Sequence, residues 1–121
     1  MSNTKSDLRK KVNLHLGVKT KKEALQVIRY KIMTDDVWLL RAIKAIYDRQ
    51  TKEEKETRET REHNGVGFSK FDANRMSKLA ILTINGMGLT PTQMFTARQI
   101  MKKYCEQLYE ISLETIERRT I

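Results

Sequence analysis

The chain has 121 residues, which is the length of one ordinary domain and too short for two independent hydrophobic cores. One proline and five glycines are too few for the turns of an all-β sandwich, and a single cysteine excludes an internal disulfide. With 24 Lys and Arg against 15 Asp and Glu, the net charge is +9, so polyanions are the first partners to consider.

The positive charge is uneven along the chain. Residues 1–31 contain nine basic and two acidic side chains, residues 32–63 seven and eight, and residues 64–121 eight and five. A basic end fits either a nucleic-acid-binding arm or a solubilising tail, and both interpretations stay open. The sequence lacks an apolar run of the roughly 18 residues that a membrane span needs and the apolar stretch of a signal peptide. We therefore expect a cytoplasmic protein with no membrane partner.

The basic N-terminal segment, residues 1–19, has no clear secondary structure in the sequence. Val12, Leu14 and Leu16 alternate before Gly17, and this pattern is short enough for a strand or for one edge of a helix. Whether the segment is ordered also stays open. We expect residues 20–121 to form a single helical domain.

Two helices are predicted after residue 19. Thr20 and Glu23 have the spacing of a capping box, in which each side chain satisfies a free backbone N–H, so a helix starts there. A second start is indicated at residues 34–36, where an oxygen-bearing cap precedes two carboxylates that the helix dipole favours. The second helix runs to about Gln50 and is predicted to be the most buried, with Trp38 as a core anchor. Its broad apolar set comprises Val37, Trp38, Leu39, Leu40, Ala42, Ile43, Ile46 and Tyr47.

The middle of the chain is polar. Residues 51–63 contain no large apolar side chain, which indicates a solvated helix or a flexible connection. A glycine-containing loop follows, in which we expect Phe68 and Phe71 to be pinned into the core. Such a loop can present N–H groups to a phosphate, but this one lacks the lysine and hydroxyl of a P-loop, and a tight turn is the preferred interpretation. The loop residues are Asn64, Gly65, Val66, Gly67 and Phe68.

Two further helices complete the predicted fold. One runs from about Asp72 to Ile84 and ends at an Asn-Gly pair, a usual C-cap. Thr90, Pro91 and Gln93 supply a cap, a proline at the first helical position and a capping-box glutamine for a long C-terminal helix. Its apolar stripe should pack mainly on the other helices, although pairing with a second copy stays open. The elements together predict an all-α, small single-domain bundle of about four to five helices.

Catalysis and metal binding are not indicated. His15, His63 and Cys105 are the only His and Cys residues, and no recognised spacing connects them to a nucleophile and base pair or to a zinc site. We expect no enzyme activity, no metal site and no cofactor.

Nucleic acid is the expected partner, through Lys and Arg that contact phosphates, with the Asn64–Phe68 loop shaping the surface. A helix-turn-helix is disfavoured because residues 85–89 form a long connection and the last helix exceeds a recognition helix, so non-specific backbone binding is predicted. The candidate contacts are Lys10, Lys11, Lys19, Lys21, Lys22, Arg29, Lys31, Lys70, Arg75, Lys78, Arg98 and Lys102.

Somewhat over half of the chain resembles an uncharacterised helical module of bacteriophage and mobile-element proteins. The shared residues are Gln50-Thr51 with Glu54, Asn64-Gly65-Val66-Gly67-Phe68 with Asp72-Ala73, Leu89-Thr90 with Gln93, then Ala97-Arg98, Lys103-Tyr104 and Gln107-Leu108. The resemblance implies a phage-type accessory protein of the bacterial cytoplasm, acting near DNA metabolism or against a host system.

Two functional hypotheses result. The first is a DNA- or RNA-binding module that contacts the phosphate backbone, whose binding weakens steeply with salt. The alternative is an adaptor or inhibitor that binds an acidic host protein, or a homodimer through the C-terminal helix, with binding that depends on exposed apolar side chains.

Overall fold

The structure is a computed structural model that describes residues 4–56 and 67–119, with side chains described in residues 4–52 and 67–115. Every regular element in these ranges is helical, which confirms the predicted all-α single domain. The elements are α1 (Lys5–Leu16), α2 (Lys21–Thr34), α3 (Asp36–Glu56), α4 (Ala73–Ile84), α5 (Pro91–Met101), η1 (Lys102–Tyr104) and α6 (Cys105–Arg119). Because α5, η1 and α6 follow one another without a gap, the predicted long C-terminal helix is a continuous helical run that contains one 3₁₀ turn.

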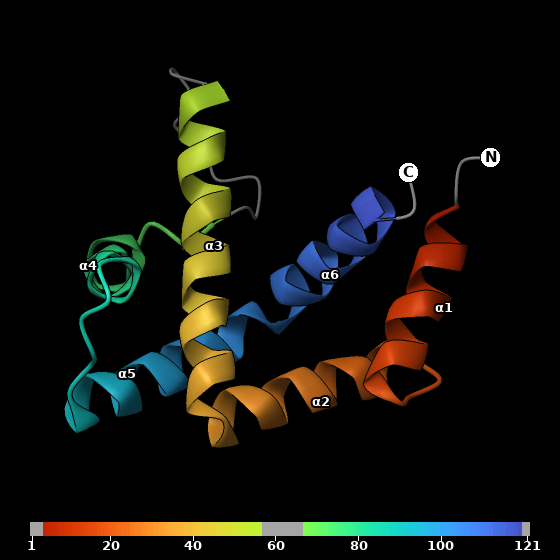
Figure 1. The fold of residues 1–121 in the computed structure, drawn as a ribbon, viewed down its shortest axis with the longest axis horizontal. Helices are drawn as coiled ribbons and strands as arrows, with labels where there is room; N and C mark the ends of the chain where they lie inside the picture. Colours follow the sequence, from red (N-terminus) through yellow and green to blue (C-terminus); the bar gives the residue numbers. More distant parts are fainter. Residues whose placement is uncertain (1–3, 57–66, 120–121) are drawn as a thin grey trace.

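Helix α3 is the centre of the fold. It packs against α2, α4, α5 and α6, while α1 packs against α2 and α6. Figure 1 shows α3 crossing α2 and α5, with α4 on one side and α6 leading toward α1 on the other. Helices α1 and α4 therefore lie at opposite ends of the longest axis of the molecule (Figure 1).

The N-terminal segment is a helix and not a strand. Thr4 and Asp7 form a complete capping box at the start of α1, and Gly17, with φ of 76°, ends the helix in the left-handed conformation. Val12 is buried, whereas Leu14 is 81% exposed. On a strand these two side chains would share one face, but on a helix they lie about 200° apart, so only the helix lets one be buried without the other.

Two of the predicted helix starts are confirmed. The Oγ1 atoms of Thr20 and Thr90 accept hydrogen bonds from the backbone N–H groups three residues later, each at 3.1 Å. At the start of α3 the cap is Asp35, whose Oδ1 accepts from the N–H of Trp38 at 3.0 Å. The Thr34 hydroxyl donates instead to the carbonyl of Tyr30 at 2.8 Å, which closes α2.

Helix α4 begins and ends close to its predicted limits. At its C-terminus the N–H of Met87 donates to the carbonyl of Leu82 at 2.9 Å, and the N–H of Gly86 donates to that of Thr83 at 3.1 Å. This pair of bonds is a Schellman motif, and Gly86 supplies the positive φ of 77° that the motif needs.

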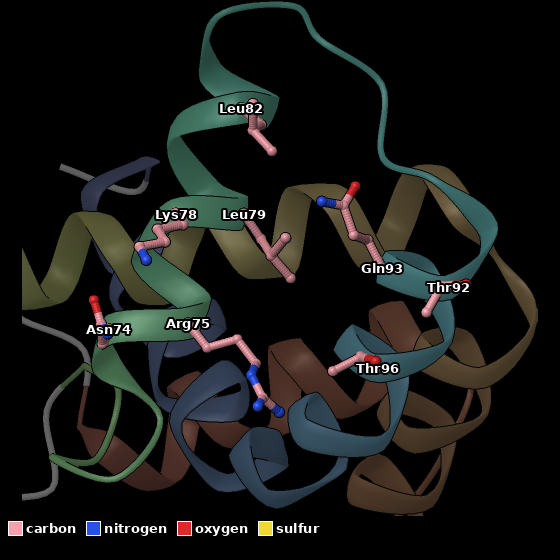
Figure 2. A pocket seen from close by; sticks show the side chains of 8 residues that line it. All are labelled: Asn74, Arg75, Lys78, Leu79, Leu82, Thr92, Gln93 and Thr96. Carbon is pink, nitrogen blue, oxygen red and sulfur yellow. The ribbon is translucent and has the colours of Figure 1, made fainter.

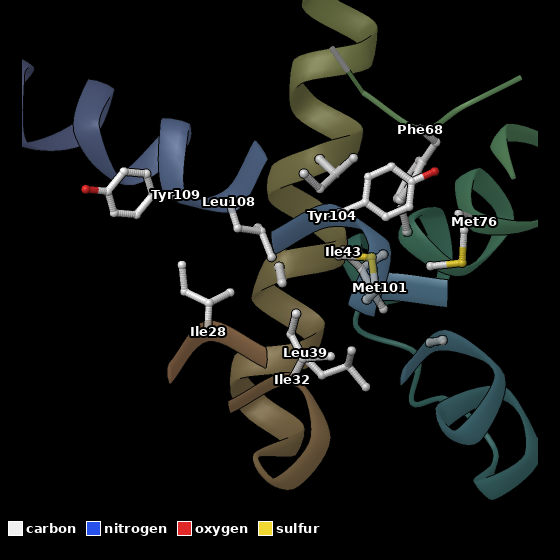
Figure 3. Close-up of a cluster of buried hydrophobic side chains, with 14 of the residues drawn as sticks. Ile28, Ile32, Leu39, Ile43, Phe68, Met76, Met101, Tyr104, Leu108 and Tyr109 are labelled. Atoms are coloured by element: carbon white, nitrogen blue, oxygen red, sulfur yellow. The ribbon is translucent and has the colours of Figure 1, made fainter. Parts of the chain in front are cut away.

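The core contains buried side chains from every helix, and Figure 3 shows part of this cluster around α3. In α3 the prediction of a deeply buried helix holds for Leu39, Ala42, Ile43 and Ile46. Trp38 is half-buried and packs against this core, so it anchors the edge of the cluster and not its centre. In the C-terminal run, Ala97, Met101, Tyr104 and Leu108 are buried, so the predicted seam is covered within its own chain. Among the described residues, no helix combines the length and the apolar character that a membrane crossing requires.

Only one of the two phenylalanines predicted to lie in the core does so. Phe68 is fully buried and packs edge-to-face on Tyr104, with ring centroids 5.4 Å apart. Phe71 is 96% exposed, so the prediction for this residue is wrong. The reason is a helical turn that begins at Ser69, whose carbonyl accepts from the N–H of Ala73 at 2.8 Å. This turn directs Phe71 away from the side on which Phe68 lies.

Candidate functional site

The segment Gly67–Ser69 leads into α4 and is held by side chains from other elements. Its three consecutive N–H groups donate to the side-chain oxygens of Gln107, Gln50 and Tyr104, at 2.8, 3.3 and 2.9 Å respectively. The Gln107 amide also donates to the carbonyl of Gly67 at 2.8 Å, so this side chain pairs with both polar groups of one residue. Because α3, η1 and α6 each contribute a partner, the segment is fixed by long-range contacts.

Gly67 is required by both conformation and space. Its φ is +80°, a value that L side chains rarely adopt. A Cβ atom placed on it would lie 2.5 Å from Cβ and 2.8 Å from Cα of Gln50, which leaves no room for a methyl group. The glycine therefore lets the segment approach α3 closely enough for the Gln50 hydrogen bond.

Asp72 is a buried carboxylate at the start of α4. Its Oδ2 accepts from the hydroxyl of Tyr104 at 2.7 Å and from the Ser69 hydroxyl at 3.3 Å, and it pairs with Nζ of Lys103 at 2.8 Å. Burial raises the pKa of Asp72, but the hydrogen bonds from Lys103 and Tyr104 outweigh it and hold the pKa below the ordinary value. The carboxylate is thus charged at neutral pH and joins η1 to the start of α4.

These contacts join residues that are far apart in the sequence. We call the set formed by Gln50, Gly67–Ser69, Asp72, Lys103–Tyr104 and Gln107 the α4-start network. Its members come from distant parts of the sequence and satisfy one another's polar groups. Lys103 is consequently a paired cation, and its charge is used inside the molecule.

A groove of about 580 Å³ lies between α4 and α5, which both pack on α3. It is lined by Asn74, Arg75, Lys78, Leu79, Leu82, Thr92, Gln93 and Thr96. Figure 2 shows Arg75 reaching from α4 toward α5, with Thr92, Gln93 and Thr96 on the facing helix. The two leucines supply an apolar floor between these polar side chains.

The groove suits an anion. Arg75 and Lys78 are exposed, and among the described residues neither forms an ion pair with a carboxylate. The lining includes no Asp or Glu. It also includes the first turn of α5, where the helix dipole favours negative charge. Arginine offers a planar fork of N–H donors that matches phosphate or carboxylate oxygens.

The sequence did not predict that Thr92 and Thr96 belong to the groove. Thr92 and Thr96 lie four residues apart on α5, so both hydroxyls face the same side of the helix. This spacing is visible in the sequence, but nothing in it says that the pair faces α4. The groove depends on how the two helices are placed on α3.

The remaining predicted contacts lie in several places. Lys31 on α2 and Lys102 on η1 are half-buried. Exposed side chains belong to Lys10, Lys11, Lys19, Lys22, Arg29, Lys70, Arg75 and Lys78. The α1 and α4 clusters lie at opposite ends of the molecule (Figure 1), so the structure does not gather them into one surface.

Two of the predicted phosphate contacts are engaged within the protein. Lys21 pairs with Glu106 at 2.9 Å and lies 5.7 Å above the ring of Tyr109. Arg98 is only 16% exposed; it donates to the carbonyl of Met33 at 3.1 Å and pairs with Asp36. These side chains join α2 to α6 and α5.

The predicted loop is described only in its last residues. Asn64 and Gly65 lie outside the described residues. Gly67 and Phe68 are buried, so they shape the path of the backbone and offer no exposed side chain.

The residues considered for catalysis are not brought together in the described part of the chain. His63 lies outside it. Burial raises the pKa of the Cys105 thiol, which keeps the sulfur protonated and weakly nucleophilic at neutral pH. Its Sγ lies 3.4 Å from the carbonyl oxygen of Lys102, within the same helical run.

Comparison with protein-family models, with curated proteins and with solved structures finds no match for this chain. The resemblance to phage and mobile-element proteins therefore stays a prediction from the sequence.

Proposed function

We propose that this protein binds nucleic acid and that the groove between α4 and α5 holds the phosphate backbone. The observation that carries the proposal is the pair formed by Arg75 and Lys78, two exposed cations in a groove lined by no carboxylate. Lys21 and Lys103, by contrast, already have anionic partners. The groove cations have their charge available for a ligand.

The charge and shape of the groove favour a chain of phosphates over a single small anion. Lys70 is exposed in the turn before α4, so the basic strip continues beyond the groove. Asn74, Thr92 and Thr96 add neutral groups that can hydrogen-bond to phosphate or sugar oxygens. Such contacts set affinity and orientation without reading bases, in agreement with the non-specific binding that the sequence predicts.

The electrostatic field of the whole protein also favours nucleic acid as the partner. The net charge of +9 attracts polyanions to the protein as a whole. Lys10 and Lys11 on α1 contribute to this attraction, although they lie at the far end of the molecule from the groove (Figure 1). We therefore separate general attraction, to which all exposed cations contribute, from contact in the groove.

A pair of charge-reversal variants distinguishes contact from attraction. Arg75→Glu with Lys78→Glu changes the groove, and Lys10→Glu with Lys11→Glu changes the net charge by the same amount on α1. Binding to labelled single-stranded DNA, duplex DNA and RNA is measured over a range of salt concentrations. We expect the groove variant to weaken binding about tenfold or more and to reduce the salt slope by about 2, because two phosphate contacts are lost.

The α1 variant is expected to weaken binding less at low salt and to keep most of the slope. Equal losses in the two variants would contradict a localised site and indicate dispersed attraction. Absence of binding by the wild-type protein to all three probes at low salt would contradict the proposal itself.

A second candidate function, docking to a protein, is favoured by apolar side chains around the α4–α5 connection. Ile84, Met87 and Phe95 are all exposed, and Phe95 borders a separate hollow with Leu89. Exposed apolar side chains that lie near one another are typical of protein-binding surfaces. Partner capture that survives moderate salt and is lost with Met87→Ser and Phe95→Ser would support this candidate.

A further inference from the structure

Phe71 is an exposed aromatic residue in the turn that leads into α4, the helix that carries the groove cations. Phe71 is 96% exposed, and single exposed apolar residues are common in folded proteins, so exposure alone indicates nothing. Its position is more informative. Asn74, Arg75 and Lys78 follow it by three, four and seven residues, the spacings that place side chains on one side of a helix.

The backbone directly before α4 makes a helical turn, so the spacing of these residues can be compared with that of a helix. The N–H of Ala73 donates to the carbonyl of Ser69 at 2.8 Å, which is the bond between residues four apart that defines an α-helix. Residues 69–73 therefore form one α-turn directly before α4, and Phe71 lies within this turn, four residues before Arg75. The hydrogen bonds of Ser69 and Asp72 to Tyr104 fix this turn, so the ring is presented from a rigid position.

We infer that the nucleic acid bound in the groove is single-stranded, with an unpaired base stacked on Phe71 while Arg75 and Lys78 hold neighbouring phosphates. This inference rests on the proposed function and adds the class of nucleic acid. An aromatic ring beside a basic groove is the combination by which proteins bind single strands without sequence preference. A phenyl ring has no hydrogen-bond donor with which to read base edges, and the base faces of a duplex are covered by their neighbours.

The test compares two exposed phenylalanines. Phe71→Ala removes the ring in the turn before α4, and Phe95→Ala removes a ring that is 64% exposed on α5 and borders the separate hollow with Leu89. Affinities are measured for an oligonucleotide of mixed sequence as a single strand of DNA, as a single strand of RNA and as a blunt DNA duplex. We expect Phe71→Ala to weaken binding of both single strands about tenfold, the effect of removing one stacked base, and to leave duplex affinity and the salt slope unchanged.

Phe95→Ala is expected to change none of these affinities. As a second readout, Phe71→Trp keeps an aromatic face and should retain single-strand affinity, with indole fluorescence that is quenched by single strands and not by the duplex. Unchanged single-strand binding by Phe71→Ala, or quenching of equal size by the duplex, would overturn the inference and leave phosphate binding in the groove intact. Failure of the wild-type protein to bind any probe at low salt would overturn the proposed function and this inference together.

Discussion

The α4-start network and the α4–α5 groove lie beside the same helix and use charge in opposite ways. In the network, Lys103 pairs with the buried carboxylate of Asp72 at 2.8 Å. Arg75 follows Asp72 by only three residues in the sequence, but it lies in the groove, whose lining contains no carboxylate. Lys103 and Arg75 contribute equally to the net charge, but of the two only Arg75 has its charge free for a ligand.

The comparison divides the residues of this region by what their removal should change. Substitutions in the network leave buried polar groups without partners and should lower the free energy of unfolding. Substitutions in the groove remove groups that solvent already hydrates, so they should change binding and leave stability nearly unaltered.

Gly67→Ala is expected to have the largest effect, lowering the free energy of unfolding by about 3 to 5 kcal/mol. The added methyl group meets the backbone of Gln50 at 2.8 Å while the residue is held at a φ of +80°. Urea denaturation followed by circular dichroism measures the change.

The matched control is Gly86→Ala. Gly86 has nearly the same φ, +77°, but nothing lies within 4 Å of an added Cβ atom. We expect this variant to lose only about 1 kcal/mol, the cost of the conformation alone. Equal losses in the two variants would show that close approach to α3 contributes nothing.

Asp72→Asn is expected to lower the free energy of unfolding by about 2 kcal/mol at neutral pH, because the ion pair with Lys103 is lost. The pKa of Asp72 is below its ordinary value of 3.8 in the folded protein. Its contribution to stability is therefore complete above that value and is lost as the pH falls through the folded pKa. The difference between wild type and variant should shrink in acid, as measured by urea denaturation at a series of pH values.

Asp48→Asn provides the control, since Asp48 is an exposed carboxylate on α3. This variant should follow the wild-type pH profile closely. A difference between wild type and Asp72→Asn that stays constant from neutral pH to strong acid would contradict the role assigned to the carboxylate.

Substitutions at two arginines are expected to have the smallest effects on stability, and they separate an effect on stability from an effect on binding. Arg98→Gln should lose about 1 to 2 kcal/mol, because the Met33 carbonyl near the end of α2 loses its donor. Arg75→Gln should change the free energy of unfolding by less than about 0.5 kcal/mol. Binding to single-stranded DNA should show the reverse order, with loss in Arg75→Gln only. A stability loss in Arg75→Gln as large as that in Arg98→Gln would contradict the division between cations bonded within the protein and cations of the groove.

The local features of the fold were predictable from the sequence. Thr20 and Thr90 cap their helices because the capping bond spans only three residues, and its partners are adjacent in the chain. The apolar stripe of the C-terminal run was also predictable, because its spacing is a local pattern in the sequence. The secondary structure of the segment before Gly17 could not be predicted, because a short alternating pattern fits both a strand and one edge of a helix.

The partners of charged residues were not predictable, since they depend on distant parts of the chain. Lys21 and Lys22 are neighbours in the sequence, but the structure pairs Lys21 with Glu106 on α6 and leaves Lys22 exposed. Phe68 and Phe71 differ in burial because of one turn that starts at Ser69. The groove itself arises from the way α4 and α5 pack on α3, and no local pattern contains that information.

The side-chain partners of Gly67–Ser69 also determine how its amide hydrogens exchange with solvent. Amides inside a helix are protected by bonds within that helix and can exchange when a single turn frays. The amides of Gly67–Ser69 donate to Gln107, Gln50 and Tyr104 from three other elements, so they are released when the segment separates from those side chains. Their exchange rates consequently report how firmly this segment, which has no regular secondary structure of its own, is docked on α3, η1 and α6.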